Sequence, residues 1–421
     1  MNQKCLLGLM LTAVLTLAAT PAVAAVFFQC PTLADPGDPA SIVYNGTFAD
    51  DGVVDGMIRA DQGEIANPVS ATQVCVHLAA GDGFVTMADR GVDGTGEGHQ
   101  QYTFGFVNVT GVPDPQVMNV GMLAAEFSAP TLTFKEGDNV YLTLTNVGMM
   151  MRPDLFDPHT VHWHGFPNAS AIFDGEPMSS ISINMGASLT YYYKVVEPGT
   201  FMYHCHVEAT EHMQMGMLGN LYVTPVQDGT LLGGYTQFAY NDGDGSTGYD
   251  VAYPVQIVAF DSNFHDKHIA VQPLPFAEMY DNYPMINGRG YPDTVNTDVL
   301  STTNPNGDPV PSQPVNSLIT ANPGERILLR ISNLSTESFF TLTVQGIPMQ
   351  VVGEGAKKRR HYYTANTVTL GGGQAMDVLL DTTGIPAGTY FLYTTNHDRL
   401  ANNEEDYGGA MTEIVIGSGV L

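Results

Sequence analysis

The sequence has few charged side chains, and very few of them are basic. Only 14% of its 421 residues are Asp, Glu, Lys or Arg, and 15 basic residues stand against 43 acidic ones, which gives a formal net charge of −28. So acidic a chain repels phosphate groups, which argues against nucleic acid or an anionic membrane surface as a partner. A cationic partner, such as a basic electron donor, is compatible with this charge.

Long apolar runs are missing beyond the N-terminus. The opening stretch MNQKCLLGLMLTAVLTLAATPAVAAV joins one lysine, a short apolar run and the small residues Ala22-Val23-Ala24. This order predicts a cleaved signal peptide over residues 1–24, and therefore a periplasmic or secreted protein. No later stretch approaches the roughly 18 apolar residues of a membrane span, so we expect none in the mature chain.

Cysteine is scarce as well, with four in the whole chain. Cys5 falls in the predicted signal peptide, which leaves Cys30, Cys75 and Cys205. In an oxidising compartment Cys30 and Cys75 are expected to form a disulfide, which would tie down an N-terminal extension spanning residues 25–99. Cys205 is then left over, between two histidines.

No long stretch has helical periodicity. Segments such as TLTFKEGDNVYLTLTNVG and ASLTYYYKVVEPGTFMYH alternate β-branched or aromatic residues with polar ones, and Gly, Pro, Asn and Asp separate them. This pattern predicts an all-β protein made of antiparallel sandwiches. The Gly- and Asp-rich segment 227–250 indicates a linker between two domains, at residues 100–226 and 251–421.

The two predicted domains repeat one another. EGDNVYLTLTNVG (136–148) is echoed by PGERILLRISNLS (323–335), PHTVHWHGFP (158–167) by FFTLTVQGIP (339–348), and EPGTFMYHCH (197–206) by PAGTYFLYTTN (386–396). The first copy holds His159, His162, His164, His204, Cys205 and His206, and this alignment places Phe340, Thr343, Gln345, Thr394, Thr395 and Asn396 at those positions in the second. The second copy is therefore predicted to keep the scaffold and to lack the site.

The residues of the first copy form the ligand set of a blue copper. A thiolate, two imidazoles and a weak axial methionine are the ligands of an electron-transferring type 1 copper, and Cys205, His159, His212 and Met217 supply them. The run GMMM (148–151), with Met202, Met213 and Met215, is expected to pack around this loop, with recruitment of soft metal ions as the alternative.

A second group of histidines is expected on one face of two strands. His204 and His206 alternate with Cys205, so both should point away from its side chain, and His162 and His164 share the same spacing. We call these four residues the four-histidine face. They are predicted to hold a second copper, with the peptide at Cys205 as the electron path between the two sites.

Other histidines carry a weaker signal. His77, His99, His265 and His268 are expected to be structural. His361, in the basic stretch KKRRHYY, is interpreted as a loop residue on a partner-binding patch, with a further ligand or proton donor as the alternative.

HTVHWHG and HCHVEATEHMQMGM resemble the two copper motifs of laccase-type multicopper oxidases, which share tandem cupredoxin domains with the copper nitrite reductases. The resemblance implies two tandem cupredoxin domains, copper as the cofactor, and a copper-dependent oxidoreductase. Such an enzyme would take electrons from an external donor and reduce a small oxidant, either oxygen or a nitrogen oxide. His162 and His206 would be the catalytic residues, either as ligands of a further copper or as proton carriers.

The chain departs from both families. Laccase-type enzymes use eight histidines, four from each of two domains, and the second copy offers none at the aligned positions. In nitrite reductases one copper is held by two histidines of one subunit and a third from the next, which here would be His164, His204 and His397 of a homotrimer. That family also has a catalytic Asp where His162 stands and a His where Gln345 stands. The alternatives are therefore an oxidase-type enzyme, a nitrite reductase, and a non-enzymatic electron carrier or copper-handling protein.

Overall fold

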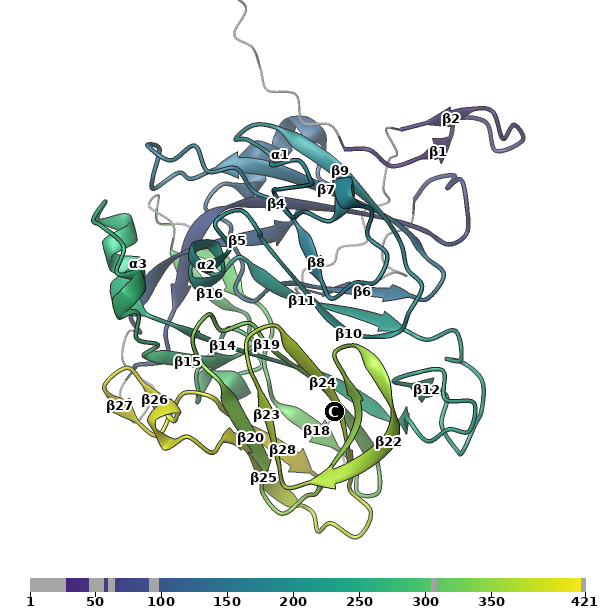
Figure 1. The fold of residues 1–421 in the computed structure, drawn as a ribbon, viewed down its shortest axis with the longest axis vertical. Helices are drawn as coiled ribbons and strands as arrows, with labels where there is room; N and C mark the ends of the chain where they lie inside the picture. Colours follow the sequence, from purple (N-terminus) through teal and green to yellow (C-terminus); the bar gives the residue numbers. More distant parts are fainter. Residues whose placement is uncertain are drawn as a thin grey trace, which may run out of the picture.

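The computed structural model describes residues 28–44, 65–90, 98–303, 307 and 309–417, and the backbone of residues 57–59. The predicted signal peptide lies outside these residues. Two β-sandwiches make up this part of the chain, the first above the second in Figure 1, which confirms the predicted all-β class. None of the helices described has the length and apolar character needed to cross a lipid bilayer.

The first sandwich has a four-stranded sheet of order β5-β4-β7-β9 and a five-stranded sheet of order β3-β6-β11-β10-β8. Buried side chains such as Leu78, Leu142, Trp163 and Tyr203 fill the space between the two sheets. The strands are β3 (Met57–Arg59), β4 (Gln73–Thr86), β5 (Gln100–Asn108), β6 (Ala129–Lys135), β7 (Asn139–Gly148), β8 (His162–His164), β9 (Ser188–Lys194), β10 (Gly199–His204) and β11 (Leu218–Thr224).

The first sandwich begins earlier than the sequence indicated. Strand β4 pairs with both β5 and β7, so the expected boundary at residue 100 falls between two paired strands. Nearly every position of β4 is buried, which removes the apolar–polar alternation that marks a half-exposed strand. The predicted disulfide between Cys30 and Cys75 is confirmed, and it joins the segment that holds β1 (Thr32–Leu33) and β2 (Ile42–Val43) to β4.

The second sandwich repeats this plan with a six-stranded sheet of order β15-β14-β19-β24-β21-β22 and a five-stranded sheet of order β18-β28-β25-β20-β23. Its strands are β14 (Val251–Phe260), β15 (Tyr283–Ile286), β18 (Ile319–Ala321), β19 (Arg326–Asn333), β20 (Phe340–Val344), β21 (Met349–Glu354), β22 (Lys357–Ala365), β23 (Thr367–Leu370), β24 (Gln374–Asp381), β25 (Gly388–Thr394) and β28 (Met411–Ile416).

Short elements connect the strands. The predicted linker 227–250 forms a small hairpin whose Tyr240 and Tyr249 pack on the second sandwich. The remaining elements are α1 (Asp114–Gly121), α2 (Ala209–Gln214), α3 (Ser262–Ile269), β12 (Gln237–Phe238), β13 (Gly248–Tyr249), β16 (Leu300–Thr303), β17 (Pro309–Gln313), β26 (Ala401–Asn402), β27 (Glu405–Asp406) and the 3-10 turns η1 (Ala171–Phe173), η2 (Phe276–Glu278), η3 (Asp293–Val295) and η4 (His397–Arg399).

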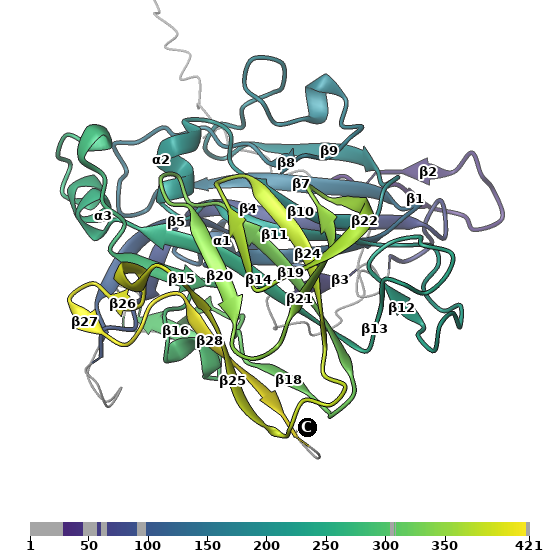
Figure 2. The same cartoon turned by 60° about the horizontal axis from the view of Figure 1, so that its bottom comes forward.

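The two sandwiches pack face to face. Met202 on β10 and Leu218 on β11 are buried in one cluster with Val258 on β14 and Ala375 on β24. The five-stranded sheet of the first sandwich therefore covers the six-stranded sheet of the second, and Figure 2 shows these strands side by side. The second sandwich consequently lies close to the end of β10, where the copper motif begins.

Strand pairing shifts part of the repeat alignment by one residue. His162 pairs with His204 in the first sandwich, and Thr343 pairs with Tyr393 in the second. Tyr393 therefore occupies the position of His204, although the sequence suggested Tyr203 because both are tyrosines. A slip of one residue moves a side chain to the other face of a strand. The second-sandwich residues at the places of His204, Cys205 and His206 are thus Tyr393, Thr394 and Thr395.

Candidate copper sites

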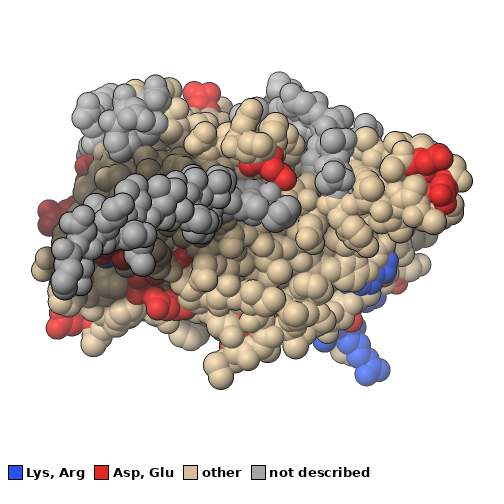
Figure 3. Space-filling view, turned by 90° about the horizontal axis from the view of Figure 1, so that it is seen from above, with Lys and Arg blue, Asp and Glu red and all other residues tan. Residues whose placement is uncertain are grey.

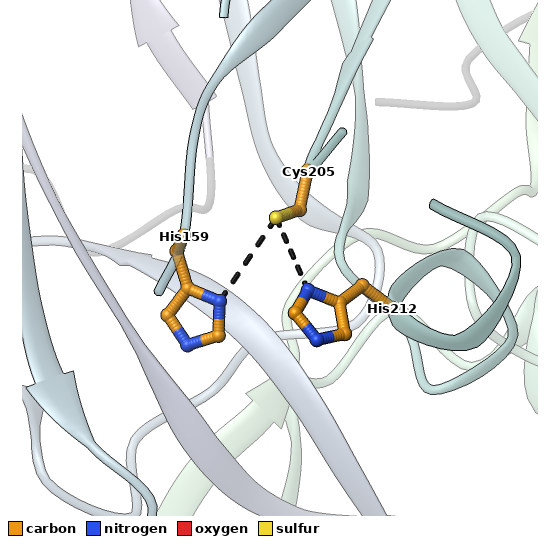
Figure 4. Close-up of side chains that lie close together, drawn as sticks. All are labelled: His159, Cys205 and His212. Carbon is orange, nitrogen blue, oxygen red and sulfur yellow. Dashed lines mark hydrogen bonds between the residues drawn. The ribbon is translucent and has the colours of Figure 1, made fainter. Parts of the chain in front are cut away.

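Three predicted type 1 ligands converge at one end of the first sandwich (Figure 4). His159 lies just before β8 and forms a β-bridge with Ile183, Cys205 directly follows β10, and His212 lies on α2. The Cys205 Sγ is 3.9 Å from the His159 Nδ1 and 3.2 Å from the His212 Nδ1. The chain therefore brings a thiol and two imidazoles together from three separate elements.

The donor set fits copper. His159, Cys205 and His212 are fully buried, and each offers one ligand atom within 4.8 Å of the other two. The Nε2 atoms of both imidazoles have no hydrogen-bond partner among the described residues. A thiolate with two buried imidazoles is the ligand combination of blue copper proteins, so the type 1 site drawn from the sequence is geometrically consistent.

Met217 closes the ligand loop through its backbone. Its carbonyl accepts a hydrogen bond of 3.1 Å from the Cys205 N–H, and its own N–H donates to the His212 carbonyl at 2.8 Å. The Met217 side chain is fully buried in the same core cluster as Cys205. Its role as the axial ligand stays a prediction.

Polar neighbours surround the type 1 site. The Thr160 N–H donates to the Cys205 Sγ at 3.4 Å, and such contacts tune the potential of a copper–thiolate site. The Asp157 Oδ2 lies 3.8 Å from the His212 Nε2. Burial opposes the charged form of His212, but the Cys205 thiolate and the Asp157 carboxylate outweigh it and raise its pKa to about 10. Sequence reasoning missed Asp157 because a single acidic residue next to a proline has no distinctive spacing.

Three members of the four-histidine face form a second group of possible ligands. His162, His164 and His204 each offer a nitrogen within 4.8 Å of the others, and the His164 Nδ1 is 3.3 Å from the His204 Nε2. The His204 Nδ1 lies 2.9 Å from the Cys205 carbonyl, and the His162 Nδ1 lies 2.6 Å from the Asp174 carbonyl. If each Nδ1 donates to its carbonyl, the Nε2 atoms of His162 and His204 are left with lone pairs for a metal.

His206 lies beside this group. Its ring centroid is 5.0 Å from that of His162 and 5.5 Å from that of His204. Burial lowers the pKa of His204 to about 3, and burial followed by the charge of His162 lowers the pKa of His164. The rings of His204 and His164 are therefore neutral near pH 7, which is the form that binds copper. The prediction that both pairs point to one side of the sheet is consistent with these ring contacts.

The second sandwich contributes a backbone turn to this face. The His164 ring lies against the backbone of Gly373, whose φ of +80° favours glycine. A Cβ on Gly373 would lie only 2.9 Å from the His164 Nε2, so a larger residue would crowd the ring. Within the described part of the chain, all three members of the histidine group come from the first sandwich.

His397 lies apart from this group. It begins the turn η4, and its side chain is exposed on the surface of the second sandwich. The corrected register puts Thr395 at the place of His206, so His397 lies two residues beyond it. A ligand role for His397 therefore stays a prediction that requires a second copy of the chain.

Comparisons with known proteins identify the family of the chain. Two family models, both described as multicopper oxidase, match residues 107–228 and 210–414. The chain therefore belongs to the multicopper oxidase family, whose members are copper-dependent oxidoreductases.

Two curated relatives are similar over one segment of about 120 residues. The chain is 32% identical over 120 residues to "Multicopper oxidase MCE" of Talaromyces pinophilus, which is 28% of this chain and 18% of that protein. It is 32% identical over 126 residues to "Laccase 1" of Metarhizium acridum, which is 29% of this chain and 19% of that one. The chain thus spans about a fifth of the length of these relatives.

A solved structure supports the fold over a longer stretch. The blue copper oxidase from Nitrosomonas europaea superposes with a TM-score of 0.59 at 22% identity, and covers 82% of this chain and 86% of its own. At this identity the likeness bears on the fold, which is that of cupredoxin domains.

Proposed function

We propose that the chain is an extracytoplasmic two-domain multicopper oxidase that passes single electrons from an external donor to a small oxidant. The observation that carries this proposal is the adjacency of the two sites. Cys205 belongs to the type 1 site, and His204, the residue before it, belongs to the histidine group. Copper in both sites would supply one-electron chemistry and an open coordination position for the oxidant.

The chain links the two sites by covalent bonds. From the Cys205 Sγ the path runs through the Cys205 and His204 backbones to the His204 ring. The hydrogen bond between the His204 Nδ1 and the Cys205 carbonyl, at 2.9 Å, adds a second connection and fixes the ring. A carrier protein would gain nothing from this second group, which favours an enzyme over a carrier.

A pocket lined in part by Glu211, the residue before His212, is the candidate donor site. Its volume is about 370 Å³, with Arg152, Glu211 and His268 at its polar side and Leu155 and Leu274 among its apolar lining. Arg152 is already paired with the exposed Asp154 at 2.8 Å. Such a lining suits a small amphipathic reductant, or the surface side chains of a redox protein.

Acidic surface favours a basic protein as that donor. On the face of the first sandwich shown in Figure 3, patches of acidic residues outnumber the basic ones, in keeping with the net charge of −28. Opposite charges would speed the encounter at low ionic strength.

His162 and His206 are proposed to handle protons or to bind a further copper. The His162 Nδ1 is 2.6 Å from the Asp174 carbonyl and 3.5 Å from the Asp174 carboxylate, so the ring has a fixed orientation and an acidic neighbour. His206 is half-buried next to it and is open to exchange protons with solvent.

A nitrite reductase is the second candidate, and the exposure of His397 favours it. With His164 and His204 from one chain and His397 from another copy, a homotrimer would hold one mononuclear copper per chain. An oxidase would instead need the full four-histidine face.

Turnover on two oxidants tests the proposal. Copper-loaded protein and a reductant should consume oxygen, or should convert nitrite to nitric oxide, and His164→Ala should abolish either reaction while the blue absorption persists. Donor oxidation that continues at the original rate in His164→Ala would instead identify a carrier.

A further inference from the structure

Helix α2, which carries His212, is too short to be stable by itself. It has six residues, whereas isolated helices below about 12 to 15 residues are marginal in water. Its N-cap residue, Glu208, has a positive φ of 46° and no capping side-chain hydrogen bond. Contacts from outside the helix must therefore fix the position of His212 relative to Cys205.

Part of that support comes from the first sandwich. The Phe104 N–H donates to the Met215 carbonyl at 2.8 Å, and the Phe104 ring packs edge-on against the His212 ring, with centroids 5.8 Å apart. These contacts hold one side of α2 and the turn that follows it.

The other support comes from the second sandwich, through three residues that we call the clamp: His265, His268 and Thr336. The His265 Nε2 is 2.9 Å from the carbonyl of Gln214, at the C-terminal end of α2 where helix carbonyls lack internal partners. The Thr336 hydroxyl donates to the Gln214 Oε1 at 2.9 Å. Both contacts act on the last residue of the helix.

His268 holds the middle of α2. Its Nε2 is 2.9 Å from the Oε1 of Glu211, which immediately precedes His212. Its ring also packs edge-on against Phe104, with centroids 4.8 Å apart. His265 and His268 both lie on α3, and Figures 1 and 2 both show α3 beside α2.

We propose that the clamp positions the type 1 ligand His212, so that the second sandwich, which has no copper ligands at the repeated positions, controls the copper site of the first. This inference rests on the proposed type 1 site. It assigns a positioning role to His265 and His268, which sequence reasoning treated as structural. Residues around a ligand commonly change metal affinity or activity by 10- to 100-fold when they are replaced.

The experiment compares His265→Leu with His265→Gln, because glutamine keeps a donor for the Gln214 carbonyl. Asn263→Ala, on the exposed side of α3, is the control. In the metal-free protein, amide exchange of residues 208–217 should accelerate about 10-fold or more in His265→Leu. In the copper-loaded protein, the same variant should change the type 1 spectrum and lose copper about 10-fold faster. His265→Gln should restore most of both effects, and Asn263→Ala should match the wild type.

Thr336→Ala, at a half-buried position, and His268→Gln, which keeps a polar side chain, repeat the test in case His265→Leu does not fold. Exchange of residues 208–217, the type 1 spectrum and copper loss all unchanged in folded variants would overturn the proposal, even if the melting temperature falls. A wild-type protein that shows no blue copper would refute the proposed function instead, whereas the exchange measurement on metal-free protein would still test the clamp.

Discussion

An asparagine at the same place in each sandwich makes the same backbone hydrogen bonds, next to His159 in the first sandwich and next to Phe340 in the second. In the first, the Asn146 Oδ1 accepts from the Gly148 N–H and its Nδ2 donates to the carbonyls of Asp157 and Ile183, the latter paired with His159. In the second, the Asn333 Oδ1 accepts from the Ser335 N–H, and its Nδ2 donates to the Ser338 carbonyl and to that of Leu370, which pairs with Phe340.

The same comparison holds at the cysteine. The Cys205 N–H donates to the Met217 carbonyl at 3.1 Å, and the Thr394 N–H donates to the Ala410 carbonyl at 3.1 Å. Phe340, Thr394 and Ala410 therefore occupy the places of His159, Cys205 and Met217. The same backbone hydrogen bonds are present in both sandwiches, and the side chains at those three positions differ.

The largest expected effect comes from the cysteine. Cys205→Ser removes the thiolate, so the blue absorption and all turnover should disappear. Thr394→Ser, at the matching place in the second sandwich, should leave both unchanged. Optical spectra of the two copper-loaded variants check this, and a blue band that survives in Cys205→Ser would place the type 1 site elsewhere.

Loss of a histidine from the second group should impair the second copper site and leave the type 1 site intact. In His204→Ala the blue absorption should persist while turnover falls by at least about 100-fold, because a direct ligand matters more than its neighbours. Tyr393→Phe is the matched change in the second sandwich and should turn over normally. Copper per chain, measured by elemental analysis, should fall only in His204→Ala.

Replacing either asparagine should lower the stability of the protein, but only the replacement of Asn146 should affect the type 1 copper site. Asn146→Ala and Asn333→Ala each leave buried backbone groups unpaired, which should cost about 1 to 3 kcal/mol of unfolding free energy. Only Asn146→Ala should alter the type 1 spectrum, because Asn146 bonds to the carbonyl of Ile183, which pairs with His159. Denaturant titration with spectra checks both parts, and an altered spectrum in Asn333→Ala would contradict the separation.

The effect that is smallest near neutral pH is a pH dependence of stability that comes from His77. This buried residue pairs with Thr143, whereas Pro254 pairs with Arg330 at the matching place in the second sandwich. Burial lowers the pKa of His77 to about 3, below the value of about 6.5 in the unfolded chain.

The unfolded state therefore binds a proton first, and the contribution of His77 to stability falls as the pH drops from about 6.5 toward 3. The slope is at most about 1.4 kcal/mol per pH unit. The His77 Nε2 lies 2.7 Å from the Thr145 hydroxyl. Urea titrations of metal-free protein at several pH values should show a shallower loss in His77→Gln, which keeps a polar partner for Thr145 but does not titrate. An unchanged slope would contradict this.

Much of the fold followed from the sequence because strand alternation and the internal repeat are visible in it. The start of the first sandwich did not, because β4 is buried on both faces and shows no alternation. The proximity of His159, Cys205 and His212 was predictable because their spacing is recognisable. Asp157, Asn146 and the clamp were not, because they act through tertiary contacts between residues far apart in the chain, such as His265 and Gln214.

Electron paramagnetic resonance of copper-loaded protein, with spins counted against total copper per chain, tests the central claim that the first sandwich holds two kinds of copper site. We predict a type 1 signal together with further copper, seen either as a type 2 signal or as silent coupled copper, and loss of that further copper in His204→Ala. A single copper per chain, fully accounted for by the type 1 signal, would contradict the account and leave an electron carrier.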